Sequence, residues 1–320
     1  MKKLISLIMI IFLSATVFSG CENRPVHDES EKLNIVVTIF PIYNWVKNIV
    51  TDKADVTLLL DNGVDMHSFQ PSVDDIIKIS ACDVLVYVGG ESDKWVDKVL
   101  LQPTNKNMLV INLLKILGEN VKKEETVEGM QAESKYDAES DEHIWLSIKN
   151  AVNLCREIAN KLGEADINNK DYYADNAKKY IEALNGLDKK YQSAVENAET
   201  KTLVFGDRFP FRYFVDDYNL SYYAAFSGCS AETEASFETV VFLANKVDEL
   251  GLDAIIYLET SDGAVAKTIK ENTISKNQKL VKFDSMQSTT SSDIENGQTY
   301  ISVMENNLKA LKEALIKRSE

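Results

Sequence analysis

Two histidines are the first candidates for chemistry, because histidine is scarce in this chain. The 320 residues contain three histidines, His27, His67 and His143. His67 lies in a glycine-containing loop, residues 61–72, between a predicted strand and a predicted helix. Ligands of open α/β sheets bind beyond the carboxyl ends of strands, which is where His67 is expected. His143 follows an acidic loop, and either histidine alone is more often an ordinary polar residue than a ligand.

Two aspartates are expected at equivalent places in the second half of the chain. Asp207 follows the predicted strand 202–205, and Asp284 follows the predicted strand 279–283. A carboxylate at such a place can also cap the next helix. Two imidazoles and two carboxylates suit a borderline divalent cation such as zinc, manganese or iron(II). Because each half of the chain supplies two of these four side chains, the sequence predicts a metal ion in a cleft between two lobes.

The third ligand has an alternative. Glu259 also stands at the end of a predicted strand, 254–258, and could replace Asp207. Both acids therefore remain candidates.

The cysteines do not suggest a metal site. Cys82 and Cys155 lie in apolar patterns and are predicted to be small buried residues. Cys229 is then left as a candidate free thiol. No cysteine spacing in the chain resembles a thiolate zinc site.

The beginning of the chain predicts export and a lipid anchor. Lys2 and Lys3 precede an apolar run, residues 4–18, which ends in a serine, a glycine and Cys21. This pattern is typical of a secretory signal and is too short for a membrane-spanning helix. A cysteine after Ser-Gly resembles a bacterial lipobox, so Cys21 is the predicted lipidation site; plain secretion is the alternative. The polar residues 21–32 then form a tether.

Charge excludes one class of partner. The formal net charge is −15, and removal of Lys2 and Lys3 with a signal peptide would leave −17. A phosphate backbone selects basic proteins, so nucleic acid is not an expected partner. A cation as cargo is compatible with this charge, although an acidic surface is more commonly only solvated.

Short apolar runs alternate with helical patterns, which is typical of α/β units with mostly parallel sheets. The predicted strands of the first half are residues 34–40, 55–60, 83–88 and 108–112. Those of the second half are residues 202–205, 220–225, 254–258 and 279–283. An acidic segment without periodicity, residues 118–142, is predicted to be a mobile loop.

Between the two halves, apolar residues recur at spacings of three and four. They are Tyr173, Ala177, Tyr180, Leu184, Leu187, Tyr191 and Ala194. One amphipathic helix of roughly 45 Å is therefore predicted. We interpret it as a connector of two lobes; packing on a single lobe is the alternative.

These patterns divide the chain into five parts. We predict a signal peptide over 1–20, a lipidated tether over 21–32, an N-terminal α/β lobe over 33–167, a linking helix over 168–199 and a C-terminal α/β lobe over 200–320.

Six short motifs, in this order around the long helix, resemble the zinc/manganese substrate-binding lipoproteins of bacterial ABC importers. They are MHSFQPS at 66–72, YVGGESDKWV at 87–96, DEHIW at 141–145, FGDRFPF at 205–211, GCSAETE at 228–234 and GQTY at 297–300. The resemblance implies two Rossmann-like lobes joined by one long α-helix, a metal in the cleft between them, small closure motion and no catalysis. It also implies a monomer that delivers its metal to a membrane permease from the outer face of the cytoplasmic membrane.

The resemblance also suggests a ligand set. His67 and His143 match the first two metal ligands of the family. Its third ligand is a histidine or glutamate, and the corresponding loop here offers Asp207 with Arg208 beside it. Asp284 matches the fourth position, where related zinc-type proteins have histidine. We expect zinc as the cargo, with manganese as the alternative that two carboxylates would favour.

Rival functions find less support. A secreted metallohydrolase would use the histidines and leave a coordination position for water, but the chain has no HExxH helix and no nucleophile elbow. Clefts for a siderophore or a sugar are usually lined with aromatic residues or arginines, and the expected cleft loops supply few. An adhesin role is not tested by the sequence.

Overall fold

The computed structural model describes residues 32–131, 139–230 and 234–316. The predicted signal peptide and Cys21 lie outside these residues, as does nearly all of the predicted tether. In the described part of the chain, no helix is long and apolar enough to cross a membrane.

The first lobe is built on a four-stranded parallel sheet with the order β2-β1-β3-β4. Its strands are β1 (Leu33–Val37), β2 (Ala54–Leu58), β3 (Val84–Tyr87) and β4 (Leu109–Asn112). Its helices are α2 (Phe40–Val50), α3 (Val73–Ala81), α4 (Lys94–Val99) and α5 (Leu113–Leu117). All four residues of β3 are buried, as expected for a central strand that is covered on both faces.

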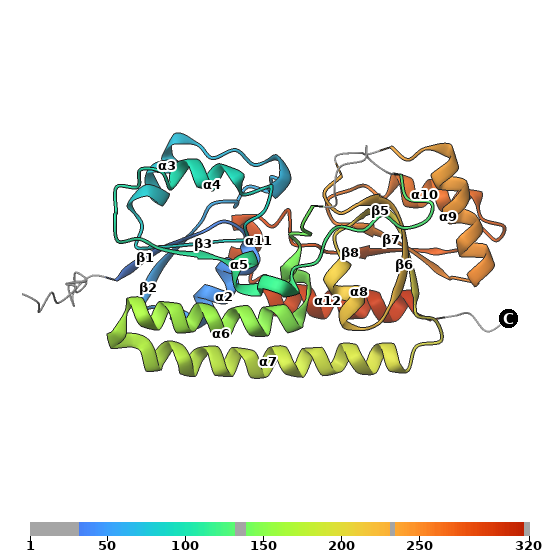
Figure 1. The fold of residues 1–320 in the computed structure, drawn as a ribbon. Helices are drawn as coiled ribbons and strands as arrows, with labels where there is room; N and C mark the ends of the chain where they lie inside the picture. Colours follow the sequence, from blue (N-terminus) through green and yellow to red (C-terminus); the bar gives the residue numbers. More distant parts are fainter. Residues whose placement is uncertain (1–31, 132–138, 231–233, 317–320) are drawn as a thin grey trace, which may run out of the picture. The chain divides into compact units, whose positions relative to one another are not determined.

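The second lobe repeats this arrangement with the order β6-β5-β7-β8, again all parallel (Figure 1). Its strands are β5 (Thr202–Phe209), β6 (Ser221–Ser227), β7 (Ala254–Leu258) and β8 (Lys279–Phe283). Its helices are α8 (Arg212–Asp217), α9 (Phe237–Leu250), α10 (Ala264–Asn272) and α12 (Tyr300–Ala314). The short helix α11 (Ser291–Glu295) lies in the segment after β8 that returns to the first lobe. In each lobe the first strand lies between the second and the third. The predicted fold class, two α/β lobes with parallel sheets, is confirmed.

The long helix between the lobes is α7 (Lys170–Glu196), which packs along α6 (Ile148–Ala165). Its buried residues are Tyr173, Ala177, Tyr180, Leu184, Leu187, Tyr191 and Val195. The predicted apolar stripe is therefore correct except at its end, where Val195 and not Ala194 is fully buried.

Helix α7 contacts both lobes. The Tyr180 hydroxyl donates to Asn44 Oδ1 in α2 at 3.2 Å, and the Tyr191 hydroxyl donates to the Met304 carbonyl oxygen in α12 at 2.5 Å. The interpretation as a connector is confirmed. The exact boundaries predicted for the lobes remain a prediction.

Two further segments pass from one lobe to the other. After β8 the chain returns to the first lobe, where Ser291 N donates to the Asp61 carbonyl oxygen at 2.8 Å. The acidic loop crosses in the opposite direction, because Gln131 N donates to the Ala225 carbonyl oxygen in β6 at 2.9 Å. The described parts of this predicted mobile loop are thus bound to the second lobe; residues 132–138 lie outside the described chain.

Candidate metal centre

His67 lies in a short 3-10 turn, Met66–Ser68, between β2 and α3. The Asp65 carboxylate caps this turn by accepting from His67 N at 3.0 Å. The imidazole is held on its other side by Ser92, whose Oγ lies 2.8 Å from His67 Nδ1. Because Nδ1 has this partner, Nε2 is the atom left to face a ligand.

His143 directly precedes another 3-10 turn, Ile144–Leu146, and is fully buried. Asp141 Oδ1 accepts from the backbone of His143 at 2.8 Å and lies 3.0 Å from its Nδ1. The ring packs against Trp145 with 5.4 Å between the centroids. A carboxylate that holds Nδ1–H fixes the tautomer with a lone pair on Nε2, the usual arrangement of a metal-binding histidine.

The two Nε2 atoms converge. His67 Nε2 lies 3.2 Å from His143 Nε2. Two nitrogens bound at roughly 2.0–2.1 Å to one tetrahedral zinc ion lie about 3.3 Å apart. The histidines, which are 76 positions apart in the chain, therefore have the separation that one metal ion requires.

The two imidazoles have opposite pKa shifts. Burial and the neighbouring His143 lower the pKa of His67 to about 4. Burial also acts to lower the pKa of His143, but Asp141 outweighs this effect and the pKa is raised. His67 is therefore neutral at pH 7 and can bind a metal directly, whereas protons compete for His143.

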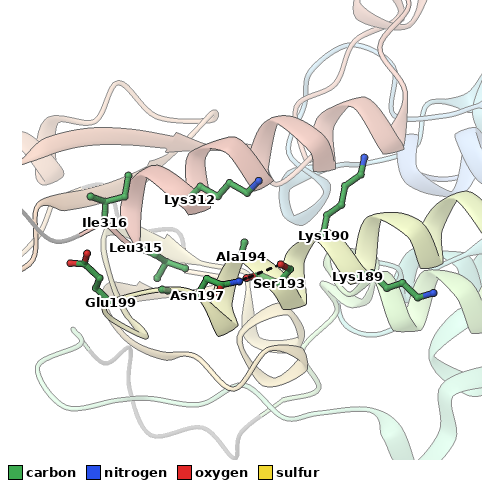
Figure 2. Close-up of a pocket in the computed structure, with 10 residues that line it drawn as sticks. Lys189, Lys190, Ser193, Ala194, Asn197, Glu199, Lys312, Leu315 and Ile316 are labelled. Atoms are coloured by element: carbon green, nitrogen blue, oxygen red, sulfur yellow. Dashed lines mark hydrogen bonds between the residues drawn. The ribbon is translucent and has the colours of Figure 1, made fainter.

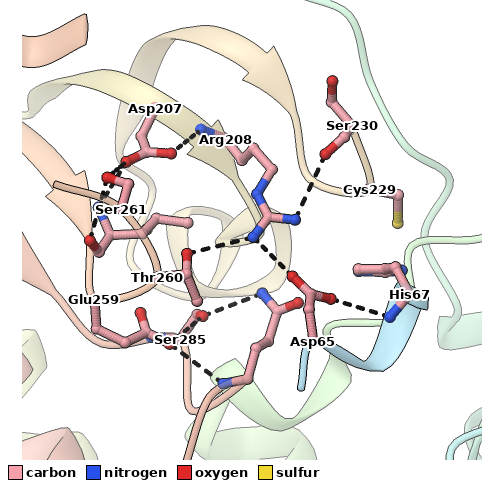
Figure 3. A network of polar contacts seen from close by, with 12 residues as sticks. Asp65, His67, Asp207, Arg208, Cys229, Ser230, Glu259, Thr260, Ser261 and Ser285 are labelled. Atoms are coloured by element: carbon pink, nitrogen blue, oxygen red, sulfur yellow. Dashed lines mark hydrogen bonds and ion pairs between the residues drawn. The ribbon is translucent and has the colours of Figure 1, made fainter. Parts of the chain in front are cut away.

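Cys229 is the third member of this group. Among the residues that the structure describes, His67, His143 and Cys229 form the one group of at least three histidines, cysteines or acids whose ligand atoms all lie within 4.8 Å of one another. In Figure 3 the Cys229 sulfur is drawn beside the His67 ring. The spacing of the cysteines in the sequence does not mark Cys229 as a ligand, because it is not that of a thiolate zinc site. The available signal was its position just after β6, at the carboxyl end of a strand.

Asp207 lies outside this group. Strand β5 does not end at residue 205 but continues through a register shift to Phe209, so Asp207 is inside the strand. Its Oδ2 accepts from Leu258 N at 3.0 Å and from the Ser261 hydroxyl, and its Oδ1 accepts from Arg208 N at 2.8 Å (Figure 3). These hydrogen bonds use both carboxylate oxygens and join β5 to β7 and to the turn after β7.

Arg208, next to it, bridges the two lobes. Its Nη2 donates to Asp65 Oδ2 at 2.8 Å and to Thr260 Oγ1 at 3.3 Å (Figure 3). Burial acts to raise the pKa of Asp65, but Arg208 and the hydrogen bond from the His67 backbone outweigh it, and the pKa is lowered. Asp65 is thus a charged link between Arg208 and the turn that carries His67.

Asp284 directly follows β8, as predicted, but it is also outside the group. Its Oδ1 accepts from Met286 N at 2.8 Å, and its backbone carbonyl oxygen accepts from Asn307 at 2.8 Å. Glu259 accepts from the backbone and the hydroxyl of Ser285 at 2.7 and 2.8 Å. The structure therefore brings together the two predicted histidines and leaves Asp207, Asp284 and Glu259 in hydrogen bonds elsewhere.

A groove of about 610 Å³ shares no lining residue with this group. It is lined by the carboxyl-terminal ends of α7 and α12, with Lys190, Lys312 and Leu315 among its residues (Figure 2). Neither histidine nor cysteine lines it, and a single acid, Glu199, does. It offers no set of metal ligands.

Residues 35–314 match the family model described as zinc-uptake complex component A, periplasmic (ZnuA). The chain belongs to this family.

Several relatives are similar over most of the chain. The zinc-binding lipoprotein AdcA of Streptococcus pneumoniae is 33% identical over 98% of this chain and 61% of AdcA. This chain thus spans less than two thirds of the length of that relative. The high-affinity zinc uptake system protein ZnuA of Bacillus subtilis is 29% identical over 91% of this chain and 90% of its own length. The Zn(II)-bound ZnuA-like domain of the pneumococcal AdcA is 31% identical, with a TM-score of 0.72 over 89% of this chain and 99% of that domain.

Proposed function

We propose that this protein captures zinc outside the cytoplasmic membrane and delivers it to the permease of an ABC importer. The observation that carries the proposal is the 3.2 Å separation of His67 Nε2 and His143 Nε2. Both rings have hydrogen-bond partners on Nδ1, so both Nε2 atoms are left to face one ion. Membership of the ZnuA family and the zinc-binding names of its relatives support the same cargo.

Zinc fits this group better than manganese. Manganese prefers oxygen ligands, and imidazole and thiol groups suit zinc. The two aspartates that made manganese a serious alternative, Asp207 and Asp284, lie outside the histidine group. We therefore propose zinc as the transported ion and no catalytic role.

A lipid anchor would place the protein beside its permease. We propose that Cys21 carries the lipid and that residues 21–32 tether a monomer to the outer face of the membrane. Incorporation of labelled palmitate into the wild-type protein, and its loss in Cys21→Ala, would test the anchor. Labelling that persists in the variant would contradict it.

Calorimetric titration of the chelator-stripped chain, from Glu22 onward, tests metal capture. Zinc should bind with one-to-one stoichiometry, and zinc at 1,000 times its dissociation constant should stabilise the fold by about 4 kcal/mol. His67→Ala and His143→Ala should each abolish this gain, whereas His27→Ala, in the predicted tether, should keep it. A chain that binds neither zinc nor manganese would overturn the proposal.

Transport itself needs a cellular test. A strain without the gene should lose zinc uptake at low external zinc and recover it with the wild-type gene. Recovery of manganese uptake alone would show that the cargo is wrong although the site is correct.

A further inference from the structure

We propose that Cys229 is a metal ligand, so that zinc is held by two imidazole nitrogens and one thiolate. This inference rests on the proposed zinc binding and specifies the donor atoms. It replaces the carboxylate Asp207 with a sulfur from the loop after β6.

The Cys229 sulfur lies close enough to both imidazoles to share an ion with them. Cys229 Sγ lies within 4.8 Å of the ligand nitrogens of both His67 and His143. Around a tetrahedral zinc ion with Zn–S of 2.3 Å, a sulfur and a nitrogen ligand lie about 3.6 Å apart. A movement of about 1 Å is therefore enough to bring the sulfur to the separation that a shared zinc ion requires.

The loop after β6 brings its backbone close to His143 at Gly228, the residue before Cys229. A Cβ at Gly228 would lie 3.1 Å from His143 Cε1 and 2.9 Å from the Phe209 carbonyl oxygen. Only glycine lets the backbone come this close to the buried histidine. Cys229 N then donates to Glu124 Oε1 at 3.0 Å, which fixes the loop to the crossing acidic segment.

A buried acid, Glu142, lies beside the histidines and the cysteine, and one of its carboxylate oxygens has no hydrogen-bond donor in the described chain. Glu142 is 1% exposed, and its Oε1 accepts from Ser92 N at 3.0 Å, while Ser92 Oγ contacts His67. Its Oε2 is buried and has no hydrogen-bond partner in the described chain. A buried carboxylate oxygen without a donor is costly unless a cation lies nearby. Together with Asp141 and Glu124, Glu142 gives the group the negative surroundings that stabilise a bound Zn²⁺.

At the position that the family resemblance gives to the third ligand, this chain has Asp207 and Arg208. Asp207 is occupied by Leu258 N and Ser261, and Arg208 is paired with Asp65. Neither side chain is available for the ion, and a guanidinium cannot bind a cation. Among the described residues, Cys229 is the side chain that forms a ligand group with the two histidines.

Binding exchanges a proton for the metal without any redox step. The Sγ–H bond of Cys229 breaks, an Sγ–Zn bond forms, and the proton leaves to solvent. A thiolate in the set favours zinc over manganese. Loss of the sulfur should therefore weaken zinc binding more than manganese binding.

Cobalt(II) substitution tests the sulfur directly. The cobalt-loaded wild-type chain should show a thiolate-to-cobalt charge-transfer band in the near ultraviolet, and Cys229→Ser should lose it. Cys155→Ala removes a different free cysteine, which is buried in α6, and should keep the band. We expect Cys229→Ser to lower zinc affinity about tenfold or more. Replacing a residue that only hydrogen-bonds to a metal ligand already lowers metal affinity by about that factor.

X-ray absorption of the zinc-loaded wild-type chain needs no variant and covers the case in which Cys229→Ser does not fold. One sulfur at roughly 2.3 Å from zinc is expected. Zinc bound by nitrogen and oxygen alone would overturn the role of Cys229 and leave the proposed function intact. Failure of the wild-type chain to bind any zinc would overturn both.

Discussion

At the scale of single residues, the candidate site depends on acids that hold the histidines in place. Asp141 binds both the backbone and the ring of His143, and both residues are almost completely buried. An ionised acceptor at Nδ1 orients the ring and makes Nε2 a better donor to a metal. The affinity of the site is therefore set partly by residues that do not touch the ion.

Replacing Asp141 with Asn should weaken zinc binding about 10–100-fold, because a neutral amide holds Nδ1–H less strongly. Competition with a chromophoric zinc chelator measures this change. Glu139→Gln, at an exposed position in the same loop, is the matched control and should bind zinc like the wild type. Equal affinity of Asp141→Asn and the wild type would show that Asp141 does not support the ligand.

A second residue, Asp93, should make the stability of the metal-free chain depend on pH. Burial raises the pKa of Asp93 to about 7, and the nearby Glu142 adds to the effect. The folded chain then binds a proton that the unfolded chain, with an ordinary aspartate pKa of about 3.9, has already released. Asp93 therefore lowers the free energy of unfolding progressively as pH rises from about 4 to about 7.

Asp93→Asn should remove this contribution and be more stable than the wild type at pH 8, by up to a few kcal/mol, with less gain at pH 5. Urea denaturation of the chelator-stripped proteins at both pH values measures the difference. Comparing the variant with the wild type at each pH separates the effect of Asp93 from that of the other titrating groups that both proteins share. Asp97→Asn, exposed on the same helix, should behave like the wild type; a pH-independent effect of Asp93→Asn would contradict the prediction.

At the scale of elements, strand β5 decides which side chains face the histidines. Its register shift between Phe205 and Arg208 keeps Asp207 inside the sheet and directs Arg208 towards Asp65 of the other lobe. The ion pair has its two side chains 16% and 22% exposed, so solvent screens it only in part. It joins the end of a strand in one lobe to the turn that carries His67 in the other.

Arg208→Gln should lower the free energy of unfolding by about 1–3 kcal/mol, because it leaves the carboxylate of Asp65 half-buried without its charged partner. It should also weaken zinc binding, since Asp65 caps the turn of His67. Urea denaturation and calorimetry measure the two effects. Arg156→Gln, exposed on α6, is the control; unchanged zinc affinity in Arg208→Gln would show that the pair does not position His67.

A separate prediction concerns Gly228, in the loop after β6. Gly228→Ala places a methyl group against His143 and the Phe209 carbonyl oxygen, so it should push Cys229 away and reduce zinc affinity. Gly186→Ala, in the middle of α7 with nothing within 4 Å of its Cβ, should bind zinc normally and be up to about 1 kcal/mol more stable. Normal zinc binding by Gly228→Ala would mean that the loop does not need this close approach.

In the described part of the chain as a whole, three segments and a shared hydrophobic core join the two lobes, and not one helix alone. Helix α7, the acidic loop and the return of the chain after β8 all cross between them. One hydrophobic cluster contains residues of both sheets, for example Val86 of β3 and Phe205 of β5, together with the buried face of α7. Separating the lobes widely would expose part of this shared core.

We therefore expect zinc to change the angle between the lobes only slightly. Small-angle X-ray scattering of the chelator-stripped and zinc-loaded chains should give the same radius of gyration within experimental error. A clear decrease on zinc binding would reveal a wide hinge and contradict the prediction.

The features that the sequence determined are those set by local periodicity. Alternation of short apolar runs with helical patterns was enough for two parallel α/β lobes, because buried strands and amphipathic helices differ in their repeat. The stripe from Tyr173 to Tyr191 identified α7 for the same reason. His67 was recognisable by its place at the carboxyl end of a predicted strand, and both histidines by their scarcity in the chain and by the motifs that resemble the family.

The tertiary structure alone decided which other side chains join the histidines. Asp207, Asp284 and Cys229 all stand near strand ends, and the sequence favoured the two carboxylates. A register shift in β5 turns Asp207 into a strand residue, and Gly228 lets Cys229 approach His143. Both effects depend on non-local contacts between neighbouring strands and between lobes, which no local pattern encodes.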